Sequence, residues 1–432
     1  MSEPEQLSVD DVFPIRGYPR YTYQPREDFE RRVQRYAESG SGVLLVYGPT
    51  KSGKSVLVKK VLPHALYVEA PNATTAEEFW NVANTTLGTF TGRTAALEAG
   101  HSDEVTLGGG LSGWIGGLFV RWKGTYSKKK LDGASATDPA NVVVLRTLRA
   151  SSRVLIIDDL HILPRDEQRK ILQNVKPFVD NGGRVVVIAA GYRAPSITTL
   201  VPNMSWSSTV EFTLWDARTL ENIAEDGWAA LNLSAPAGLA AELAEQSYGS
   251  PQTMQKLSSA LAHSNGYEYR QAEPATLTAP ADDQTFYKGT LSSVLLEVQW
   301  LRKLTDGPAG RPRNQYKTHS HGDADGYKLI VLALRDLLPN MEITSRDLQR
   351  KILEITTFTT PPAAPRKNET TSKLASMSKM ASRPILDDAN EAELERDNET
   401  AGVDPVLEYQ ENEAVVRIVD PLFAFALRWW PI

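Results

Sequence analysis

The segment 43–60, VLLVYGPTKSGKSVLVKK, constrains the fold of this chain more than any other stretch. An apolar strand leads into a G-x-x-x-x-G-K-S loop and a helix follows, which is the context in which such a loop holds a polyphosphate. Glycines let the backbone wrap closely around phosphates, and backbone N–H groups with the helix N-terminus direct positive charge at them. We expect Lys54 to reach the β- and γ-phosphates and the Ser55 hydroxyl to bind Mg²⁺. The residues predicted to surround the nucleotide are Gly48, Pro49, Thr50, Lys51, Ser52, Gly53, Lys54, Ser55 and Val56.

A second motif, VLIIDDLHILP, follows about a hundred residues downstream and ends an apolar run in two carboxylates. A buried strand that ends in this way beside a phosphate loop is expected to supply the Mg²⁺ and water site. Asp158 is expected to hold Mg²⁺ through its coordinated water, and Asp159 to polarise the attacking water. Solvated aspartates at a strand end are the alternative interpretation.

The segments around these motifs alternate between short apolar strands and helices. Strands that are apolar throughout and separated by helices predict a buried parallel sheet, and hence an α/β fold of the P-loop NTPase type. The expected strands are 43–47, 65–69, 154–157, 184–189 and 210–214. A glycine-rich insertion at about 89–137 separates the second strand from the third. It is predicted to be either a surface excursion or a contact surface carried by Trp114, Phe119 and Trp122.

The second half of the chain reads as helices followed by a small domain. Helical patterns over 216–268 predict a lid, and a Pro- and Ala-rich linker follows. Three helices and a β-ribbon then predict a winged helix-turn-helix. The predicted divisions are 1–40 for a lead and helix, 41–215 for the nucleotide-binding core, 216–268 for the lid, 269–322 for linker, helix and basic loop, and 323–432 for the winged helix.

The order of phosphate loop, acidic pair, fourth strand and helical lid resembles the AAA+ and STAND classes of P-loop ATPase, in particular prokaryotic STAND-like and archaeal-type ATPases. The resemblance covers about 13–263 and implies ATP and Mg²⁺ as cofactors. It also implies that Gly249 and Pro251 of the YGSPQ lid motif contact the nucleotide. In AAGYR, alanines replace the usual polar sensor, which leaves Arg193 as the candidate. Gln252 stands where many AAA+ lids carry a second sensor arginine, which favours the STAND class.

Further positions stay open between two interpretations. Arg184 and Arg193 are either trans-acting arginines or structural. Tyr23 and Arg26, where the family clamps adenine, are expected either to stack on the base or to dock a surface strand. The family usually carries Glu at the position of Asp159, and the shorter side chain predicts slow hydrolysis.

The charges of the predicted winged helix partly favour and partly oppose nucleic-acid binding. Its basic residues are Arg366, Lys367, Lys373, Lys379 and Arg383. The stretch 387–413 holds eleven acidic residues and only Arg396 as a base, so it would repel phosphate or occupy the basic face. The domain is therefore either a DNA reader or a packing and latch element.

The loop that precedes this domain has two further patterns. Its basic residues Arg311, Arg313 and Lys317 are either a phosphate site or solvated charges. His319, His321, Asp323 and Asp325 have metal-like spacing, or are simply exposed.

Bulk properties narrow the function classes. At 432 residues the chain is long enough for two or three domains, and its net charge of −6 confines any nucleic-acid site to a local basic face. Without cysteine there is neither a disulfide nor a thiolate metal site. The acidic start and the lack of an 18-residue apolar run predict a cytoplasmic protein without a membrane span.

Three functions remain. The first is an ATP-dependent regulatory switch that self-associates or acts on a separate effector protein, as in prokaryotic signalling or anti-phage defence. The alternative is a DNA-acting AAA+ ATPase, such as an origin-binding or transposition-type loader. A small-molecule kinase is disfavoured because no acceptor pocket is evident.

Overall fold

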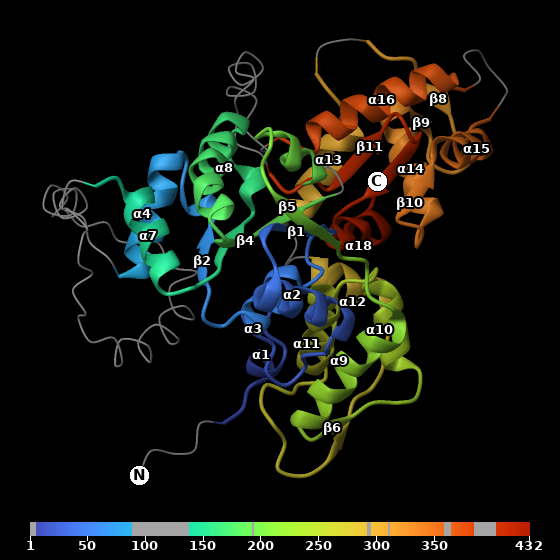
Figure 1. Cartoon of the computed structure of the whole chain (residues 1–432). Helices are drawn as coiled ribbons and strands as arrows, with labels where there is room; N and C mark the ends of the chain where they lie inside the picture. The colour runs from blue at the N-terminus through green and yellow to red at the C-terminus, as the bar shows by residue number, and fades with distance from the viewer. Residues whose placement is uncertain are drawn as a thin grey trace, which may run out of the picture.

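A five-stranded parallel sheet organises the first half of the molecule (Figure 1). The computed structural model describes residues 6–88, 138–191, 194–291, 295–309, 312–357, 364–383 and 403–432. The strands are β1 (Gly42–Gly48), β2 (Leu66–Glu69), β3 (Leu155–Asp158), β4 (Arg184–Ala190) and β5 (Trp206–Glu211), in the order β2-β3-β4-β1-β5. The register sets Gly48 opposite Ala190 and Asp158 opposite Ile188, so the phosphate loop and the acidic pair leave the same edge of the sheet.

Alternating side chains of these strands build a separate core on each face. Leu45, Ile157 and Val187 face helices α4 (Ala76–Leu87), α7 (Ala140–Ala150) and α8 (Arg165–Asp180). Leu44, Ile156 and Val186 face α2 (Glu27–Ser39) and α3 (Lys54–Val61). This period of two explains why each strand reads as a continuous apolar run in the sequence. Three 3₁₀ turns, η1 (Ala70–Asn72), η2 (Leu160–Ile162) and η3 (Ala194–Thr199), leave the carboxyl ends of strands.

The lid consists of three helices that follow the sheet. They are α9 (Ala217–Ala230), α10 (Leu239–Gln246) and α11 (Pro251–Ser264), with the two-residue strands β6 (Leu233–Ser234) and β7 (Ala275–Thr276). Asp216 and Ser250 cap α9 and α11 by accepting hydrogen bonds from backbone N–H groups, which fixes where these helices begin. The lead segment, with α1 (Val9–Val12), lies on the lid, and the Val9 amide donates to Glu268 O at 2.9 Å.

The C-terminal domain, residues 295–432, contains the three helices and ribbon predicted from the sequence. Its helices are α13 (Leu295–Asp306), α14 (Gly326–Leu337), α15 (Ser345–Ile355), α16 (Lys367–Met380) and α18 (Pro421–Trp429). Strand β10 (Glu342–Thr344) joins the ribbon of β11 (Leu407–Gln410) and β12 (Val415–Ile418), and β8 (Tyr316–Lys317) pairs with β9 (Asp323–Ala324).

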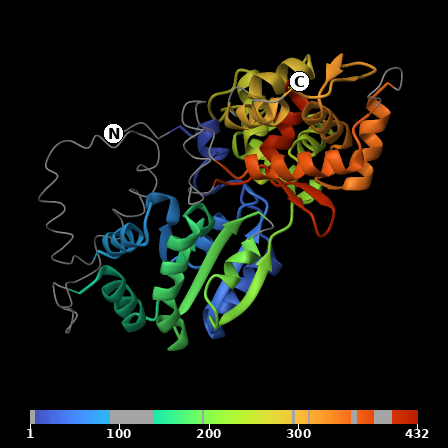
Figure 2. The ribbon, with the colours of Figure 1, turned by 90° about the horizontal axis from the view of Figure 1, so that it is seen from above.

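The lid and the C-terminal domain share one hydrophobic core. Helix α12 (Asp283–Leu291) joins them, and its Tyr287 stacks on Trp429 of α18 with ring centroids 4.4 Å apart. The Trp429 indole N–H donates to Gln246 of α10 at 3.0 Å. Figure 2 shows the consequence: sheet and flanking helices form one half of the molecule, and the lid with the C-terminal domain forms the other.

Some elements differ from the sequence prediction. The fifth strand begins four residues earlier than expected. In the range 269–322, where one helix was predicted after a linker, the structure has two helices, α12 and α13. The insertion at 89–137, with Trp114, Phe119 and Trp122, lies outside the described residues. Within the described part of the chain, no helix is long and apolar enough to cross a bilayer.

Candidate functional site

The phosphate loop connects β1 to α3, and its own side chains donate hydrogen bonds to its backbone carbonyls. Gly53 has a left-handed φ of 86°, a conformation that glycine adopts without strain. The Lys54 ammonium donates to Gly48 O at 3.1 Å and Pro49 O at 2.6 Å, and the Ser52 hydroxyl donates to Pro49 O at 2.8 Å. A nucleotide phosphate can therefore replace backbone carbonyls as the partner of Lys54.

Lys54 is the central cation of the site. Its side chain is buried, and burial lowers its pKa, while Asp404, Asp159 and Asp158 act in the opposite direction. Three carboxylates thus surround one lysine. One lysine does not neutralise three carboxylates, so this site has a surplus of negative charge until a further cation binds.

Asp158 ends β3 as a buried carboxylate with one free oxygen. The Tyr67 hydroxyl donates to Oδ2, whereas Oδ1 is buried and has no hydrogen-bond partner among the described residues. Burial raises the pKa of Asp158, opposed chiefly by the hydrogen bond from Tyr67. A buried acceptor of this kind calls for an explanation, and a hard cation held by the Asp158 and Ser55 oxygens supplies one. The residues therefore fit Mg²⁺.

Asp159 follows in a left-handed conformation with φ 56°, and its amide donates to Ile188 O at 3.0 Å. This turn separates the two side chains: Asp159 lines the cavity over the loop. Burial together with the charges of Asp158 and Asp404 raises the pKa of Asp159 to about 7. A carboxylate with a raised pKa beside Lys54 is a suitable general base for an attacking water.

A third carboxylate reaches this site from the C-terminal domain. Asp404 lines the same cavity as Lys54 and Asp159. His161 Nδ1 accepts the Ala190 amide at 3.4 Å, so Nε2 carries the proton of the neutral ring and donates to Asp404 at 2.8 Å. Partial enclosure opposes ionisation, but the hydrogen bond from His161 holds the pKa of Asp404 below its usual range. Asp404 is therefore charged. Asp159, His161 and Asp404 each offer one atom that could bind a metal, and these three atoms lie within 4.8 Å of one another.

The cavity extends from this carboxylate cluster toward the lead segment and measures about 280 Å³. Tyr23, Arg26 and Trp215 line its far end. The Arg26 guanidinium lies 4.3 Å from the Phe29 ring centroid and 5.0 Å from that of Trp215, and donates to Thr213 O at 2.9 Å. A planar cation and an indole together offer stacking surfaces that suit a nucleobase. A larger hollow of about 490 Å³ between α13, α14 and Trp430 is lined by Asp325 but by no residue of the phosphate loop or the acidic pair.

Apart from Asp158, the predicted site residues fall into three groups. Thr50 to Val56, Asp159, Pro251 and Gln252 line the cavity with Tyr23 and Arg26. Gly48 and Pro49 form the base of the loop, and Gly249 backs onto Leu214 instead of lining the cavity. Arg193 lies outside the described residues.

Arg184 lies at the opposite end of its strand from the site. It starts β4, and its guanidinium donates to the carbonyls of Ala37 and Ser152. This favours the structural interpretation of Arg184.

Sequence reasoning missed several lining residues. Trp215 donates to Ser52 O at 2.9 Å, and Gln255 lines the cavity from the lid. Of the residues that were missed, only Asp404 could have been noticed in the sequence, because it belongs to the acidic run that ends at Glu413.

The other candidate sites are engaged in ordinary contacts. Asp325 pairs with Arg313 at 2.5 Å and caps α14, and His321 contacts Arg335 at 3.1 Å. The His319–Asp325 stretch does not form a metal cluster among the described residues.

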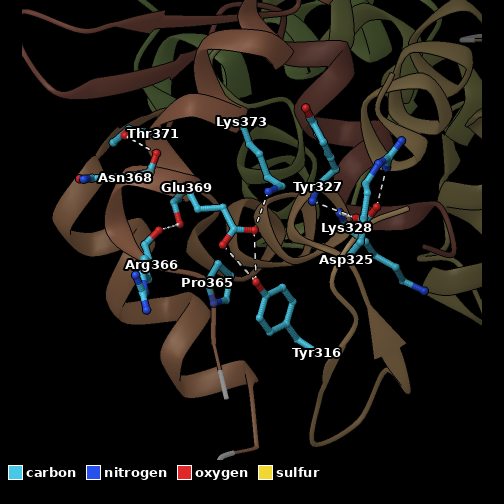
Figure 3. Close-up of polar contacts among 12 residues, drawn as sticks. Tyr316, Asp325, Tyr327, Lys328, Pro365, Arg366, Asn368, Glu369, Thr371 and Lys373 are labelled. Atoms are coloured by element: carbon cyan, nitrogen blue, oxygen red, sulfur yellow. Dashed lines mark hydrogen bonds and ion pairs between the residues drawn. The ribbon is translucent and has the colours of Figure 1, made fainter. Parts of the chain in front are cut away.

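The helix α16 does not present all of its cations to solvent. Figure 3 shows that Lys373 points inward to Glu369, 2.6 Å away, while Glu369 also accepts from Tyr316. Arg366, Lys367, Lys379 and Arg383 remain exposed. The basic face is thus smaller than its sequence indicates.

Comparisons with solved structures place the fold. A Walker-type ATPase of Pyrococcus abyssi is 14% identical over 96% of this chain and 99% of its own, with a TM-score of 0.54. Cdc6p of Pyrobaculum aerophilum is 13% identical over 98% of both chains, with a TM-score of 0.40. A STAND protein with a tetratricopeptide repeat sensor from Pyrococcus horikoshii is 14% identical over 83% of this chain and 45% of its own, with a TM-score of 0.34.

No protein-family model and no curated protein matches the sequence. Together with the phosphate loop and the parallel sheet, the first of these comparisons shows that this chain has the fold of a P-loop ATPase. At such low identity the likeness concerns the fold alone.

Proposed function

We propose that this chain binds ATP with Mg²⁺ in the cavity above Lys54, hydrolyses it slowly, and acts as a regulatory switch that repositions its C-terminal domain. The observation that carries the proposal is the place of Asp404. A residue of the C-terminal domain lies beside the acidic pair of the nucleotide-binding core, where the γ-phosphate of ATP is expected. Bound Mg²⁺ would neutralise phosphate charge at Ser55 and Asp158.

Residues at different places along the cavity have different proposed roles. Lys54 binds the β- and γ-phosphates, and Asp159 accepts the proton of the attacking water. Arg26 and Trp215 hold the base at the other end. Asp404 and the γ-phosphate carry like charges and compete for Lys54 and His161. ATP with its γ-phosphate therefore favours withdrawal of the segment around Asp404, whereas ADP tolerates it.

Replacing Asp404 with asparagine is expected to tighten binding of a non-hydrolysable ATP analogue with Mg²⁺ by about three- to tenfold, because one negative charge is removed from a partly exposed site. Asparagine keeps the size of the side chain and its contact with His161. ADP affinity should change less, since it lacks the γ-phosphate. Titration calorimetry of both nucleotides measures the difference. Glu411→Gln removes an exposed carboxylate from the same segment and is the matched control. Equal affinities for Asp404→Asn and wild type would contradict the competition.

The switch is tested directly by hydrodynamics. The molecular mass and sedimentation coefficient should change between ADP and the ATP analogue, through self-association or through a more extended monomer. A single unchanged species in both nucleotides would refute the switch. The finer role, in signalling or anti-phage defence through a separate effector protein, rests on the resemblance. Phage plating on cells that express the chain or its Lys54→Ala variant tests it.

A DNA-acting ATPase is the second candidate, favoured by the exposed cations Lys367 and Lys379 of α16 and Arg366 and Arg383 beside its ends. It predicts DNA binding that weakens steeply with salt and is lost when Arg366 and Lys367 become alanine. Absence of binding to duplex DNA at low salt would exclude it.

A further inference from the structure

A buried ion cluster joins the phosphate loop to the C-terminal domain at a second place, away from Asp404. The Lys51 ammonium is 2.7 Å from Glu297 Oε1 of α13 and also pairs with Asp420, which precedes α18. The carboxylates are almost fully enclosed, with side-chain exposures of 8% for Glu297 and 6% for Asp420. The pairs connect three segments that are distant in sequence.

The charges of this cluster balance. Burial works against the charge of Lys51, but Asp420 and Glu297 outweigh it and raise the pKa of Lys51. Lys256 of α11 is close enough to interact electrostatically with Glu297 and Asp420, so two basic and two acidic side chains meet here. Removing one member of such a buried set leaves an uncompensated charge, which is far more costly than losing a surface ion pair.

The backbone of Lys51 explains why this residue is informative. Its φ is 57°, in the left-handed region that a side chain with a Cβ disfavours. Glycine would take this conformation freely, so lysine at this position costs stability in the loop. The cost is offset where the side chain makes contacts that glycine lacks, and those contacts are with the C-terminal domain.

Hydrogen bonds to backbone carbonyls connect the same segments. The Thr50 amide donates to Val419 O at 3.3 Å, and Ser250 of the lid donates to Lys51 O at 3.3 Å. Asp420 also accepts the Leu422 amide at 2.9 Å and so caps α18. The apex of the phosphate loop, the lid and the start of α18 therefore meet at one point.

We propose that Lys51 is a positioning residue that tethers the phosphate loop to the C-terminal domain through Glu297 and Asp420, so that nucleotide binding and release of this domain are coupled. The inference rests on the proposed function for the nucleotide part alone, because the tether itself is present without nucleotide. Lys51 does not offer its charge to the phosphates. A nucleotide that reshapes the loop apex moves Lys51 and strains the tether, and by reciprocity a broken tether favours the nucleotide-bound loop.

The test uses the full chain and hydrogen exchange of residues 415–427, which include β12 and the start of α18. In wild type the ATP analogue should accelerate this exchange. In Lys51→Gly, exchange should be about tenfold faster without nucleotide, because local opening no longer breaks a buried ion cluster. The analogue should then add little, and it should bind more tightly than to wild type by a similar factor.

Three further variants distinguish loss of the tether from a general loss of stability. Lys51→Arg keeps the cation and should show wild-type exchange of residues 415–427 in the absence of nucleotide. Asp420→Asn keeps the cap of α18 but removes the charge, and should act like Lys51→Gly without adding to it in the double variant. Asn203→Gly relieves another left-handed residue, with φ 58°, remote from the cluster, and should change nothing.

The outcomes are distinct. Wild-type exchange rates in Lys51→Gly, or additive effects in the double variant, would overturn the tether. Failure of wild type to bind ATP would refute the proposed function while the nucleotide-free comparison still tests the tether.

Discussion

Replacing Lys54 with alanine is expected to weaken ATP-analogue binding by about 10- to 100-fold and to lower hydrolysis by about 10²- to 10³-fold. Lys54 is a buried cation at the carboxylate end of the cavity, and it already faces three carboxylates. Without it, the phosphates would meet Asp158, Asp159 and Asp404 with no fixed positive side chain between them. Calorimetry and a phosphate-release assay measure the two effects.

The Lys54 variant needs a control for folding, because the native side chain also donates to Gly48 O and Pro49 O. Thermal unfolding without nucleotide shows whether the variant folds, because removing Lys54 leaves three carboxylates without their shared cation. Lys176→Ala removes a lysine paired with Asp180 on the remote helix α8 and should leave binding unchanged. Undiminished hydrolysis by a folded Lys54→Ala protein would exclude this cavity as the catalytic site.

Replacing Asp159 with asparagine is expected to lower hydrolysis by about 10²- to 10³-fold while ATP-analogue affinity stays equal or rises slightly. Asparagine tolerates the left-handed conformation that Asp159 adopts with φ 56°, so the turn after β3 should persist. The change removes the carboxylate that accepts a proton and one negative charge. Single-turnover hydrolysis with saturating ATP isolates the chemical step from binding.

The matched control for Asp159 is Asp166→Asn, an exposed aspartate at the start of α8 that pairs with Arg169. It should hydrolyse at the wild-type rate. Wild type itself should turn over slowly, because aspartate is shorter than the glutamate usual in the AAA+ and STAND ATPases that the sequence resembles. Many turnovers per second, abolished in Asp159→Asn, would retain the general base but refute the slow switch.

Local sequence patterns predicted the nucleotide-binding half well. The apolar runs that predicted strands lie in the sheet, because each strand is covered on both faces and must be apolar throughout. The fifth strand was misplaced, since in Trp206–Glu211 only Val210 is buried and the apolar signal is weak there. The lid and the three-helix-and-ribbon order followed from helical periodicity.

The sequence alone determined that this chain has a phosphate loop at Gly48–Ser55 and an acidic pair at Asp158–Asp159, because these functions need particular residues at fixed short spacing. Only the tertiary structure decided which residues surround them. Lys51 meets Glu297 and Asp420 across 246 and 369 positions, and His161 meets Asp404 across 243. No periodicity or spacing connects residues so far apart. Their meeting depends on how the C-terminal domain packs with the lid over the edge of the sheet, and that packing is set by a hydrophobic core distributed along the whole second half of the chain.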